Sequence, residues 1–388
     1  MAKDKYFWLL ILIVCGYLFP FLGATDFNTK GASREAIVAL SMLNQNNWIL
    51  PINNGVDIAY KPPFYHWCVA LISTLTGGVT EYASRIPSAI ALAIMTLTGY
   101  VFFARRASAE VAFIMALVTL TNFEVHRSGT GCRVDMMLSA FMVVASYQLY
   151  QWGEKRLQGI PYMAILCLSG AVLTKGPVGM VLPCLVTVVF LWIRSEIKLP
   201  QIICSFLWVA LASSLLPLIS WYWAAYQQGG DAFLQLVLEE NVWRFLGKMT
   251  YESHENPVYY NVITILAGYM PYTLLVVISL FVWKHRETFF RKRSWWSCLR
   301  ENLFKMNDVR LFSILNIVLV FFFYCIPKSK RSVYLLPIYP FIAYFLAEYI
   351  LYLRHIRPIA LKIFGNIIVP FSLLLLVVFI FLRLGWDP

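Results

Sequence analysis

Residues 160–194 read IPYMAILCLSGAVLTKGPVGMVLPCLVTVVFLWIR, two apolar segments on either side of the polar island Thr174-Lys175-Gly176-Pro177. A helix needs about 20 mostly apolar residues to cross the hydrocarbon core of a bilayer. The stretch therefore predicts two membrane spans, beginning near Ile160 and Val178, with a cation and helix-breaking residues where they meet.

Four further polar islands interrupt the chain in the same way, each with a cation beside helix-breaking or aromatic residues. They are Tyr60-Lys61-Pro62-Pro63, Arg133-Val134-Asp135, residues 239–260 and Pro327-Lys328-Ser329-Lys330-Arg331. When the spans are counted as below, all five islands emerge on the same side of the bilayer. Each cation alone is explained as a snorkelling cap of its span. Together they favour one site for an anion, because ammonium groups, guanidinium groups and helix N-terminal N–H groups all bind anions.

The composition excludes a soluble domain. Apolar residues make up 60% of the 388 residues and charged residues 13%, and the mean hydropathy is +0.67. We predict an all-α integral membrane protein in which residues 1–388 form a single transmembrane domain of about eleven helices. The first span covers residues 6–24 and acts as a signal anchor. The others begin near Arg85, Glu110, Asp135, Ile160, Val178, Ile202, Val258, Leu311, Val333 and Ile359.

The distribution of positive charge predicts the orientation in the membrane. Loops that face the cytoplasm are rich in Lys and Arg. With the N-terminus inside, every predicted inner segment carries such residues: Arg105 and Arg106, Lys155 and Arg156, Arg194 and Lys198, residues 284–310, then Arg354 and Arg357. The sequence therefore predicts a multi-pass protein of the cytoplasmic (inner) membrane, with the five islands facing the periplasm or exterior.

Two long outer loops, residues 25–84 and 227–257, are predicted to contain juxtamembrane helices. In the first, Ala36, Ala39, Leu40 and Leu43 recur at helical spacing, and the apolar stretch 61–75 is too short to span and is predicted to lie at the interface. The inner loop 284–310 is strongly basic, which indicates contact with the inner leaflet and no need for nucleic acid. The chain ends at Pro388 just after the last span, so no C-terminal soluble domain is expected.

The sequence gives no sign of a disulfide scaffold, a metal-ligand cluster or a nucleotide-binding motif. The eight Cys are dispersed without a CxxC pair, and the five His form no ligand cluster. There is no P-loop and no GxGxxG. An enzyme outside the cytoplasmic membrane would therefore need an energy-rich substrate that is already attached to lipid.

The chain resembles, over nearly its whole length, the polytopic glycosyltransferases that include the protein O-mannosyltransferases and the lipid A aminoarabinose transferases. The residues that carry the resemblance are Arg34 with Met42-Leu43, Asn47-Trp48-Ile49-Leu50-Pro51, Lys61-Pro62-Pro63 with Trp67, Arg133-Val134-Asp135-Met136, Thr174-Lys175-Gly176-Pro177, residues 240–245 with His254, Pro257, Tyr259 and Tyr260, and Lys328-Ser329-Lys330-Arg331 with Tyr334-Leu335-Leu336-Pro337. The resemblance implies a GT-C architecture, a membrane helical bundle that takes a sugar from a polyprenyl-phosphate carrier. The implied partners are this donor, a lipid or protein acceptor and the bilayer.

The implied chemistry is a displacement at the anomeric carbon, in which an acceptor hydroxyl or phosphate attacks and the polyprenyl phosphate leaves. A carboxylate helps an acceptor hydroxyl to lose its proton, and cations stabilise the charge on the departing phosphate. The candidate carboxylates are Asp135, which could also be a helix N-cap, and Glu35, which could also be an exposed salt-bridge partner. The phosphate candidates are Lys61, Arg244, Lys328, Lys330, Arg331, Lys175 and Arg133. The candidates that line the substrate site are Arg34, Tyr60, His254, Tyr259, Tyr260 and Tyr334, although the tyrosines are also ordinary aromatics of the membrane interface.

Departures from the family pattern affect the identity of the catalytic base and the case for a bound metal. Ala32 stands where relatives have an acidic residue two positions before the Arg of the first loop, so Asp135 and Glu35 both remain candidates. Tyr60 and Asn241 stand where some members have Glu and His, which disfavours a divalent metal. We therefore expect no cofactor.

Three other classes of protein are weighed against a transferase. A transporter or flippase of lipid-linked sugars would place polar groups near the bilayer midplane and often shows a repeat, and neither is evident. A polyprenyl-pyrophosphate-dependent glycan ligase or polymerase would also use many cations. A scaffold that binds anionic lipid leaves the order of the motifs unexplained.

Overall fold

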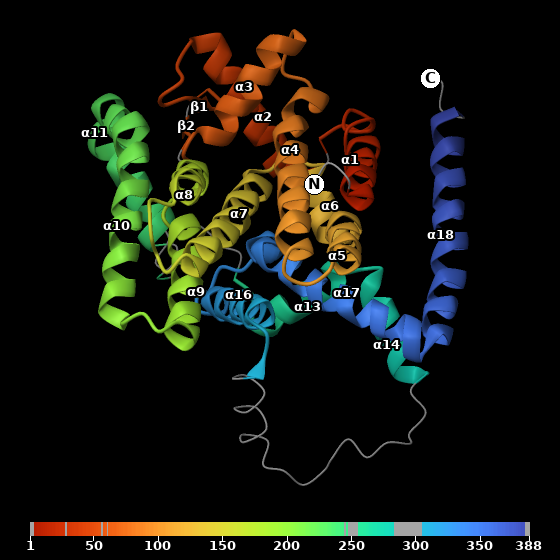
Figure 1. Cartoon of the computed structure of the whole chain (residues 1–388). Coiled ribbons are helices and arrows are strands. Elements are labelled where there is room, and N and C mark those ends of the chain that lie inside the picture. The colour runs from red at the N-terminus through yellow and green to blue at the C-terminus, as the bar shows by residue number, and fades with distance from the viewer. Residues whose placement is uncertain are drawn as a thin grey trace.

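The computed structural model is a helical protein that describes residues 4–27, 29–55, 57–59, 61–243, 246, 255–282 and 305–384. Figure 1 shows a bundle of long helices, with shorter helices gathered at one end. The only strands among the described residues, β1 (Ile52–Asn53) and β2 (Asp57–Ile58), pair antiparallel at that end. The predicted all-α membrane architecture is confirmed.

The main helices begin close to the predicted positions, because a run of apolar residues is what the hydrocarbon core selects. They are α1 (Lys5–Leu18), α4 (Glu81–Ala104), α5 (Ala109–Thr121), α7 (Val134–Glu154), α8 (Tyr162–Lys175), α9 (Val178–Arg194), α10 (Leu199–Pro217), α13 (Tyr259–Gly268), α14 (Tyr272–Phe281), α16 (Asp308–Cys325), α17 (Tyr339–Ile356) and α18 (Pro358–Leu384).

The predicted count of about eleven spans is not reproduced by helix length. Within the described residues, five helices are long and apolar enough to cross a membrane, or seven if each of two bent pairs is one span. Helices α1, α8 and α9 are shorter than a full span. Helix α5 is bent by 67° against α6 (Phe123–Gly129), and α13 by 95° against α14. The second break lies at Pro271, which has no N–H to continue the helix.

The second outer loop is more helical than predicted. Helix α10 continues through a π-helical turn, η1 (Leu218–Tyr222), into α11 (Trp223–Leu238) and η2 (Glu239–Trp243). The chain kinks inside α11 at Gly230, whose φ of 56° and ψ of −143° are outside the helical region. The predicted loop that starts at residue 227 is therefore helical as far as Trp243, and its remaining part up to residue 254 lies outside the described residues, apart from Leu246.

The first outer loop folds into α2 (Lys30–Gln45) and α3 (Phe64–Thr76), which pack together (Figure 1). The helix predicted there is present, and α2 buries Ala36 and Ala39 as expected, together with Ala32 and Met42. Leu40, which was predicted on the same face, is instead 42% exposed. Helix α3 has 13 residues, which agrees with a separate helix too short to span.

Two tryptophan N–H groups hold this loop on the bundle. Trp67 Nε1 donates to the carbonyl oxygen of Trp48 at 2.7 Å, and Trp221 Nε1 donates to that of Ile49 at 2.6 Å. The loop that precedes α3 is thereby joined both to α3 and to η1, which fixes the position of the segment that carries Lys61.

Helix α7 lies at the centre and connects two polar ends of the molecule. It packs against α4, α8 and α9, and its 21 residues span about 31 Å at 1.5 Å per residue. Its N-terminus lies near α2 and α3, and its C-terminus lies at the other end. Aromatic side chains fill the core beside it, among them Phe102, Phe103, Tyr147, Phe312 and Phe341.

At the end opposite α2 and α3, ion pairs join neighbouring helices. They are Arg106–Glu154, Arg194–Asp308 at 3.2 Å, Arg310–Glu348 at 3.0 Å and Arg354–Glu110 at 2.6 Å. These cations all belong to the segments predicted to lie inside. The structure thus gathers the predicted inner segments at one end of α7, while the first outer loop packs at the other.

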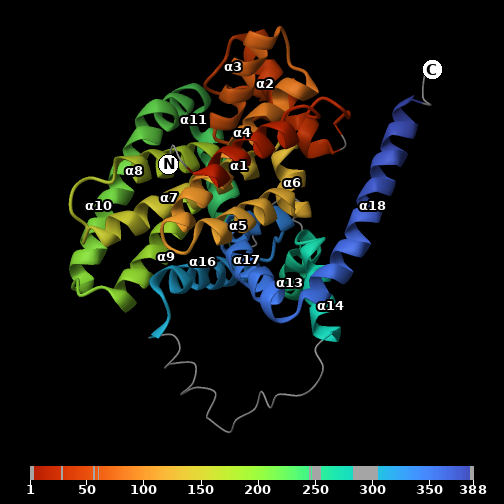
Figure 2. The same ribbon diagram turned by 45° about the vertical axis from the view of Figure 1, so that its right-hand side comes forward.

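Helix α18 stands apart from the rest of the bundle in both views (Figures 1 and 2). It touches α14 and α17 near its start. None of its most apolar 18-residue window is buried by protein. An apolar helix that is exposed on all sides is typical of contact with lipid.

Candidate functional site

A cavity of about 620 Å³ opens at the α2–α3 end of the molecule. Five of its lining residues are cations and two are carboxylates. The lining consists of Lys30, Gly31, Ser33, Arg34, Glu35, Ile37, Asn54, Lys61, Arg133, Val134, Asp135 and Arg331. These residues come from α2, the hairpin, the loop before α3, the start of α7 and the segment before the 3-10 helix η3 (Ser332–Ile338). Segments far apart in the sequence therefore meet in one positively charged pocket.

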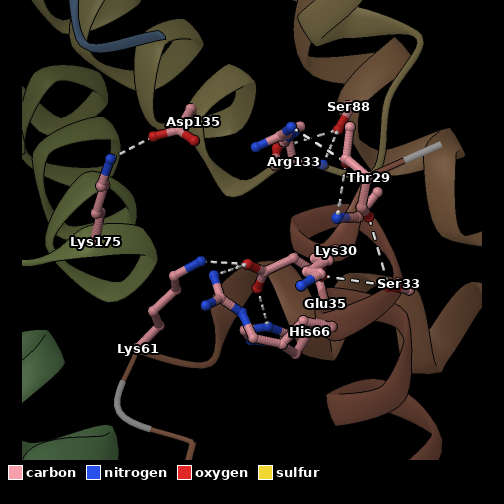
Figure 3. A network of polar contacts seen from close by, with 12 residues as sticks. Thr29, Lys30, Ser33, Glu35, Lys61, His66, Ser88, Arg133, Asp135 and Lys175 are labelled. Atoms are coloured by element: carbon pink, nitrogen blue, oxygen red, sulfur yellow. Dashed lines mark hydrogen bonds and ion pairs between the residues drawn. The ribbon is translucent and has the colours of Figure 1, made fainter. Parts of the chain in front are cut away.

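Glu35 is the most heavily coordinated carboxylate of the cavity (Figure 3). It is 3% exposed. Its Oε1 accepts from Lys61 Nζ and, at 3.0 Å, from Arg34 Nη2, while its Oε2 lies 2.7 Å from His66 Nε2. Burial alone would raise the pKa of the Glu35 carboxyl, but Lys61, His66 and Arg34 outweigh it and hold that pKa well below its ordinary value. Glu35 is therefore a stable anion and not an exposed salt-bridge partner.

Lys61 projects into the same cluster from the loop that ends in Pro62 and Pro63. Its side chain is 16% exposed. Burial lowers the pKa of the Lys61 ammonium, and the charge of Glu35 opposes that effect. A largely dehydrated ammonium at the edge of a cavity is well suited to an anionic ligand that can enter it.

Asp135 pairs with Lys175 across the start of α7 and the end of α8 (Figure 3). The Lys175 ammonium also lies 4.4 Å from the centre of the Tyr334 ring. Arg133, and not Asp135, occupies the N-cap position of α7, and no side chain caps that helix. The interpretation of Asp135 as the N-cap is therefore wrong. Both charges are favoured by the helix dipoles, the carboxylate at an N-terminus and the ammonium at a C-terminus.

Arg133 is held at the rim of the cavity against the start of α2. Its Nη2 donates to Thr29 Oγ1 at 3.2 Å, and its backbone exchanges hydrogen bonds with Ser88 Oγ. A Cβ added to Gly31 would lie 3.2 Å from Arg133 Nη1, so a residue without a side chain lets the guanidinium approach the helix.

Only one of the three cations predicted near residue 330 lines the cavity. Arg331 lines the cavity. Lys330 is 5% exposed and donates to the carbonyl oxygen of Pro327 at 2.6 Å, and Lys328 is exposed and outside the lining. The backbone at Arg331 is extended, and successive side chains of an extended chain point to opposite sides. The phosphate candidates Lys328 and Lys330 are thus placed away from the cavity.

The remaining predicted site residues divide into three groups. Arg34 lines the cavity, whereas Tyr334 contacts Lys175, which is outside the lining and pairs with the lining residue Asp135. Tyr259, which is 65% exposed, and Tyr260 lie on α13 and are not part of the lining. Tyr60, Arg244 and His254 lie outside the described residues.

The structure adds polar residues that the sequence analysis did not single out. His66 contacts Glu35, and Lys30, Ser33 and Asn54 line the cavity. Lys30 precedes Arg34 by one helical turn, so the i,i+4 spacing could have identified it. His66 carries no such local signal, because its partner is 31 positions away.

The second outer segment also reaches the site. A Cβ on Gly176, the residue after Lys175, would lie 2.5 Å from Asn241 Oδ1. Gly176 has a φ of +101°, a conformation that other residues rarely adopt. The close approach explains why glycine occupies this position, and it places η2 directly beside the Lys175–Asp135 pair.

Within the part of the chain that the structure describes, no three His, Cys, Asp or Glu side chains gather in a way that could hold a metal. The cysteines described there are free thiols. The groups that converge on the cavity are instead ammonium, guanidinium and carboxylate, a set that recognises a phosphorylated ligand.

The architecture, with juxtamembrane helices over a membrane bundle and a cationic cavity between them, is that of a multi-pass membrane protein with the GT-C fold. ArnT from Cupriavidus metallidurans, solved with bound undecaprenyl phosphate, superposes with a TM-score of 0.73 over 94% of this chain and 62% of that chain, at 17% identity. The oligosaccharyltransferase AglB from Archaeoglobus fulgidus, solved with an inhibitory peptide and a dolichol-phosphate, gives 0.51 over 95% of this chain and 55% of that chain, at 12% identity.

Sequence comparison identifies the relatives within this class. Residues 60–223 match the family described as dolichyl-phosphate-mannose-protein mannosyltransferase. The undecaprenyl phosphate-alpha-4-amino-4-deoxy-L-arabinose arabinosyl transferase of Shewanella sediminis is 27% identical over 96% of this chain. A second enzyme of that name from Proteus mirabilis is 28% identical over 88% of the chain. The chain is similar to these aminoarabinose transferases over most of its length, and it has the predicted GT-C fold. It spans 64% of the length of the Shewanella relative and 58% of the Proteus relative.

Proposed function

We propose that this chain is a glycosyltransferase that moves a sugar from a polyprenyl-phosphate-linked donor to an acceptor at the outer face of the membrane. The observation that carries the proposal is the cavity in which Lys30, Arg34, Lys61, Arg133 and Arg331 surround two carboxylates. Undecaprenyl phosphate occurs in the names of the relatives and in the ArnT structure, which supports this donor class.

The excess of positive charge in the cavity suits the leaving group. As the bond from the anomeric carbon to the phosphate oxygen breaks, the electron pair leaves with the phosphate, and the negative charge on the phosphate grows. Preorganised cations stabilise that charge in the transition state more than in the ground state. Lys61 and Arg34 share Glu35, so both are already oriented before the donor binds.

The two carboxylates are proposed to have different roles in the reaction. Glu35 has a basic partner on each oxygen, Lys61 and Arg34 on Oε1 and His66 on Oε2, so neither oxygen is open to an acceptor hydroxyl and Glu35 acts by orienting the cations. Asp135 faces the cavity from the first turn of α7, paired with Lys175. Asp135 therefore takes the proton when the acceptor is a hydroxyl, of a glycan or a protein. A phosphate acceptor on an envelope glycolipid such as lipid A needs no such base.

The cavity is proposed to face the periplasm or exterior of the inner membrane. Basic segments are retained on the cytoplasmic side, and the end of the bundle opposite the cavity carries the cluster of Arg106, Arg194, Arg310 and Arg354 with their acidic partners. The orientation is checked by attaching a membrane-impermeant thiol reagent to Lys30→Cys and Arg156→Cys proteins in intact cells. Labelling at position 30 alone supports the proposed orientation, and labelling at position 156 alone reverses it.

We propose that the transfer reaction needs no resident divalent metal. Asn241 stands where some family members have His, and its amide donates to the carbonyl oxygen of Val237 at 2.9 Å. Neither an amide nor the phenol of Tyr60 is a strong ligand for zinc. Transfer measured with purified protein is expected to be unchanged by EDTA. A loss that added Zn²⁺ or Mg²⁺ restores would overturn this mode.

The function itself is tested by mass analysis of membrane lipids from cells with and without this chain. A polyprenyl-phosphate sugar that is consumed, together with a glycolipid or protein that gains one sugar, is the expected result and identifies the acceptor. If no product changes mass but the intact lipid-linked sugar moves between leaflets, the chain is a transporter and the proposal is refuted.

A further inference from the structure

We propose that His66 is a positioning residue that acts through Glu35 to fix the ammonium of Lys61 for the phosphate of a polyprenyl-phosphate donor. The inference rests on the proposed function, and it assigns a role to a buried side chain that contributes nothing to the lining of the cavity. His66 lies in the first turn of α3, and Glu35 lies on α2.

The two oxygens of Glu35 have different partners (Figure 3). Oε1 accepts from Lys61 and Arg34, whereas Oε2 has His66 at 2.7 Å. A carboxylate with a donor on each oxygen cannot rotate without losing a charge-assisted hydrogen bond. His66 therefore sets the plane of the carboxylate, and that plane sets where the Lys61 ammonium lies.

The environment of the imidazole agrees with a donor role for Nε2. The His66 side chain is 2% exposed, and its Nδ1 is buried without a hydrogen-bond partner among the described residues. A proton on Nδ1 would leave a buried N–H without an acceptor, which is costly. The tautomer with its proton on Nε2 avoids that cost and donates to Glu35 Oε2.

Loss of this donor would change how Glu35 holds Lys61. An unpaired Oε2 can turn so that both carboxylate oxygens bind the ammonium, which draws Lys61 toward α2 and away from an incoming phosphate. Because a phosphate must compete with Glu35 for Lys61, a tighter grip by Glu35 weakens donor binding. A purely structural role, joining α3 to α2, would instead lower stability and leave donor affinity unchanged.

The test compares His66→Gln with His66→Asn. The amide nitrogen of Gln can reach the position of Nε2, whereas that of Asn falls near Nδ1 and cannot reach Glu35. Both variants replace imidazole by a neutral amide, and they differ by one methylene group. Binding of a polyprenyl phosphate to the full-length protein in lipid nanodiscs is the measurement, with the donor KM and kcat for transfer measured in parallel.

We expect His66→Gln to bind within about twofold of wild type. We expect His66→Asn to bind about tenfold more weakly, the value of one hydrogen bond to a charged group, with a matching rise in KM. In a Glu35→Gln background, the difference between the two variants should disappear, because His66 acts through the carboxylate.

Equal affinities for the two His66 variants, or a difference that persists in the Glu35→Gln background, would overturn the inference while leaving the proposed function in place. A wild-type protein that neither binds polyprenyl phosphate nor transfers sugar would overturn the proposed function, and the inference with it. The two failures are therefore distinguished by the wild-type measurement alone.

Discussion

Replacement of Lys61 by Met tests the assignment of the cavity most directly. Methionine keeps most of the length of the lysine stem and removes the charge. One hydrogen bond to a charged group is worth about 1.5–3 kcal/mol. At 1.4 kcal/mol for each factor of ten, the affinity for polyprenyl phosphate should fall by roughly 10- to 150-fold.

The same substitution also removes one of the three partners of Glu35. Breaking a buried ion pair costs about 3–5 kcal/mol when no other partner remains. Arg34 and His66 remain on Glu35, so the loss of stability should be smaller, about 1–2 kcal/mol. Thermal unfolding of the nanodisc protein measures this loss separately from binding.

Lys328→Met is the matched control. Lys328 belongs to a family motif and was predicted from the sequence to bind phosphate, yet it is exposed and outside the cavity lining. Its replacement should change affinity by less than about twofold, as expected for an exposed cation remote from the ligand. Equal losses for the two variants, or an unchanged affinity for Lys61→Met, would refute the assignment of this cavity as the phosphate site.

Three further predictions follow from particular contacts. The folded-state pKa of Glu35 is depressed, so the stability that wild type has over Glu35→Gln should be complete at neutral pH, begin to fall near the ordinary unfolded pKa of about 4.3, and shrink further as the pH falls toward the folded value. Unfolding midpoints at about pH 7 and about pH 3 check this, and a constant difference would contradict it. Gly176→Ala should reduce transfer at least tenfold, because the backbone strain at a φ of +101° and the clash of the new Cβ with Asn241 Oδ1 cost about 1–3 kcal/mol beside Lys175. Gly159→Ala is the control: this glycine also has a positive φ, but no atom lies within 4 Å of its added Cβ, so the change should affect stability and not transfer. Arg354→Gln should lower stability by less than about 1 kcal/mol, because the pair it breaks is half exposed; a larger shift on thermal unfolding would show that the ion pairs at this end act as a network.

The starts of the helices could be predicted from the sequence because hydrocarbon demands long apolar runs, which are visible in a single segment. The breaks within these apolar runs could not be predicted. Residues 258–283 read as one apolar span, yet α13 and α14 meet at 95°. Pro271 signals a kink but not its angle, which depends on contacts such as the hydrogen bond from Phe123 N to Met270 O.

The candidate site was predicted in outline. Among the cations of the predicted outer segments, Lys61, Arg133 and Arg331 line one cavity. Lys328 and Lys330 fit the same sequence pattern but lie outside the lining, because a sequence does not show to which side of an irregular segment each side chain points. Lys330 satisfies its ammonium on the carbonyl oxygen of Pro327, a local contact that no composition rule predicts.

The helix termini explain why the charges converge on this cavity. The first turn of α7 has no side-chain cap, so its free N–H groups need an anion or water, and Val134 and Asp135 in that turn line the cavity. Asp135 already places one negative charge there, and Lys175 at the end of α8 neutralises it. A phosphate that enters is therefore met by the remaining cations, the N-terminus of α7 and an ion pair of no net charge. The Asp135–Lys175 pair thus lets a carboxylate lie close to a second anion, an arrangement that a base beside a departing phosphate requires.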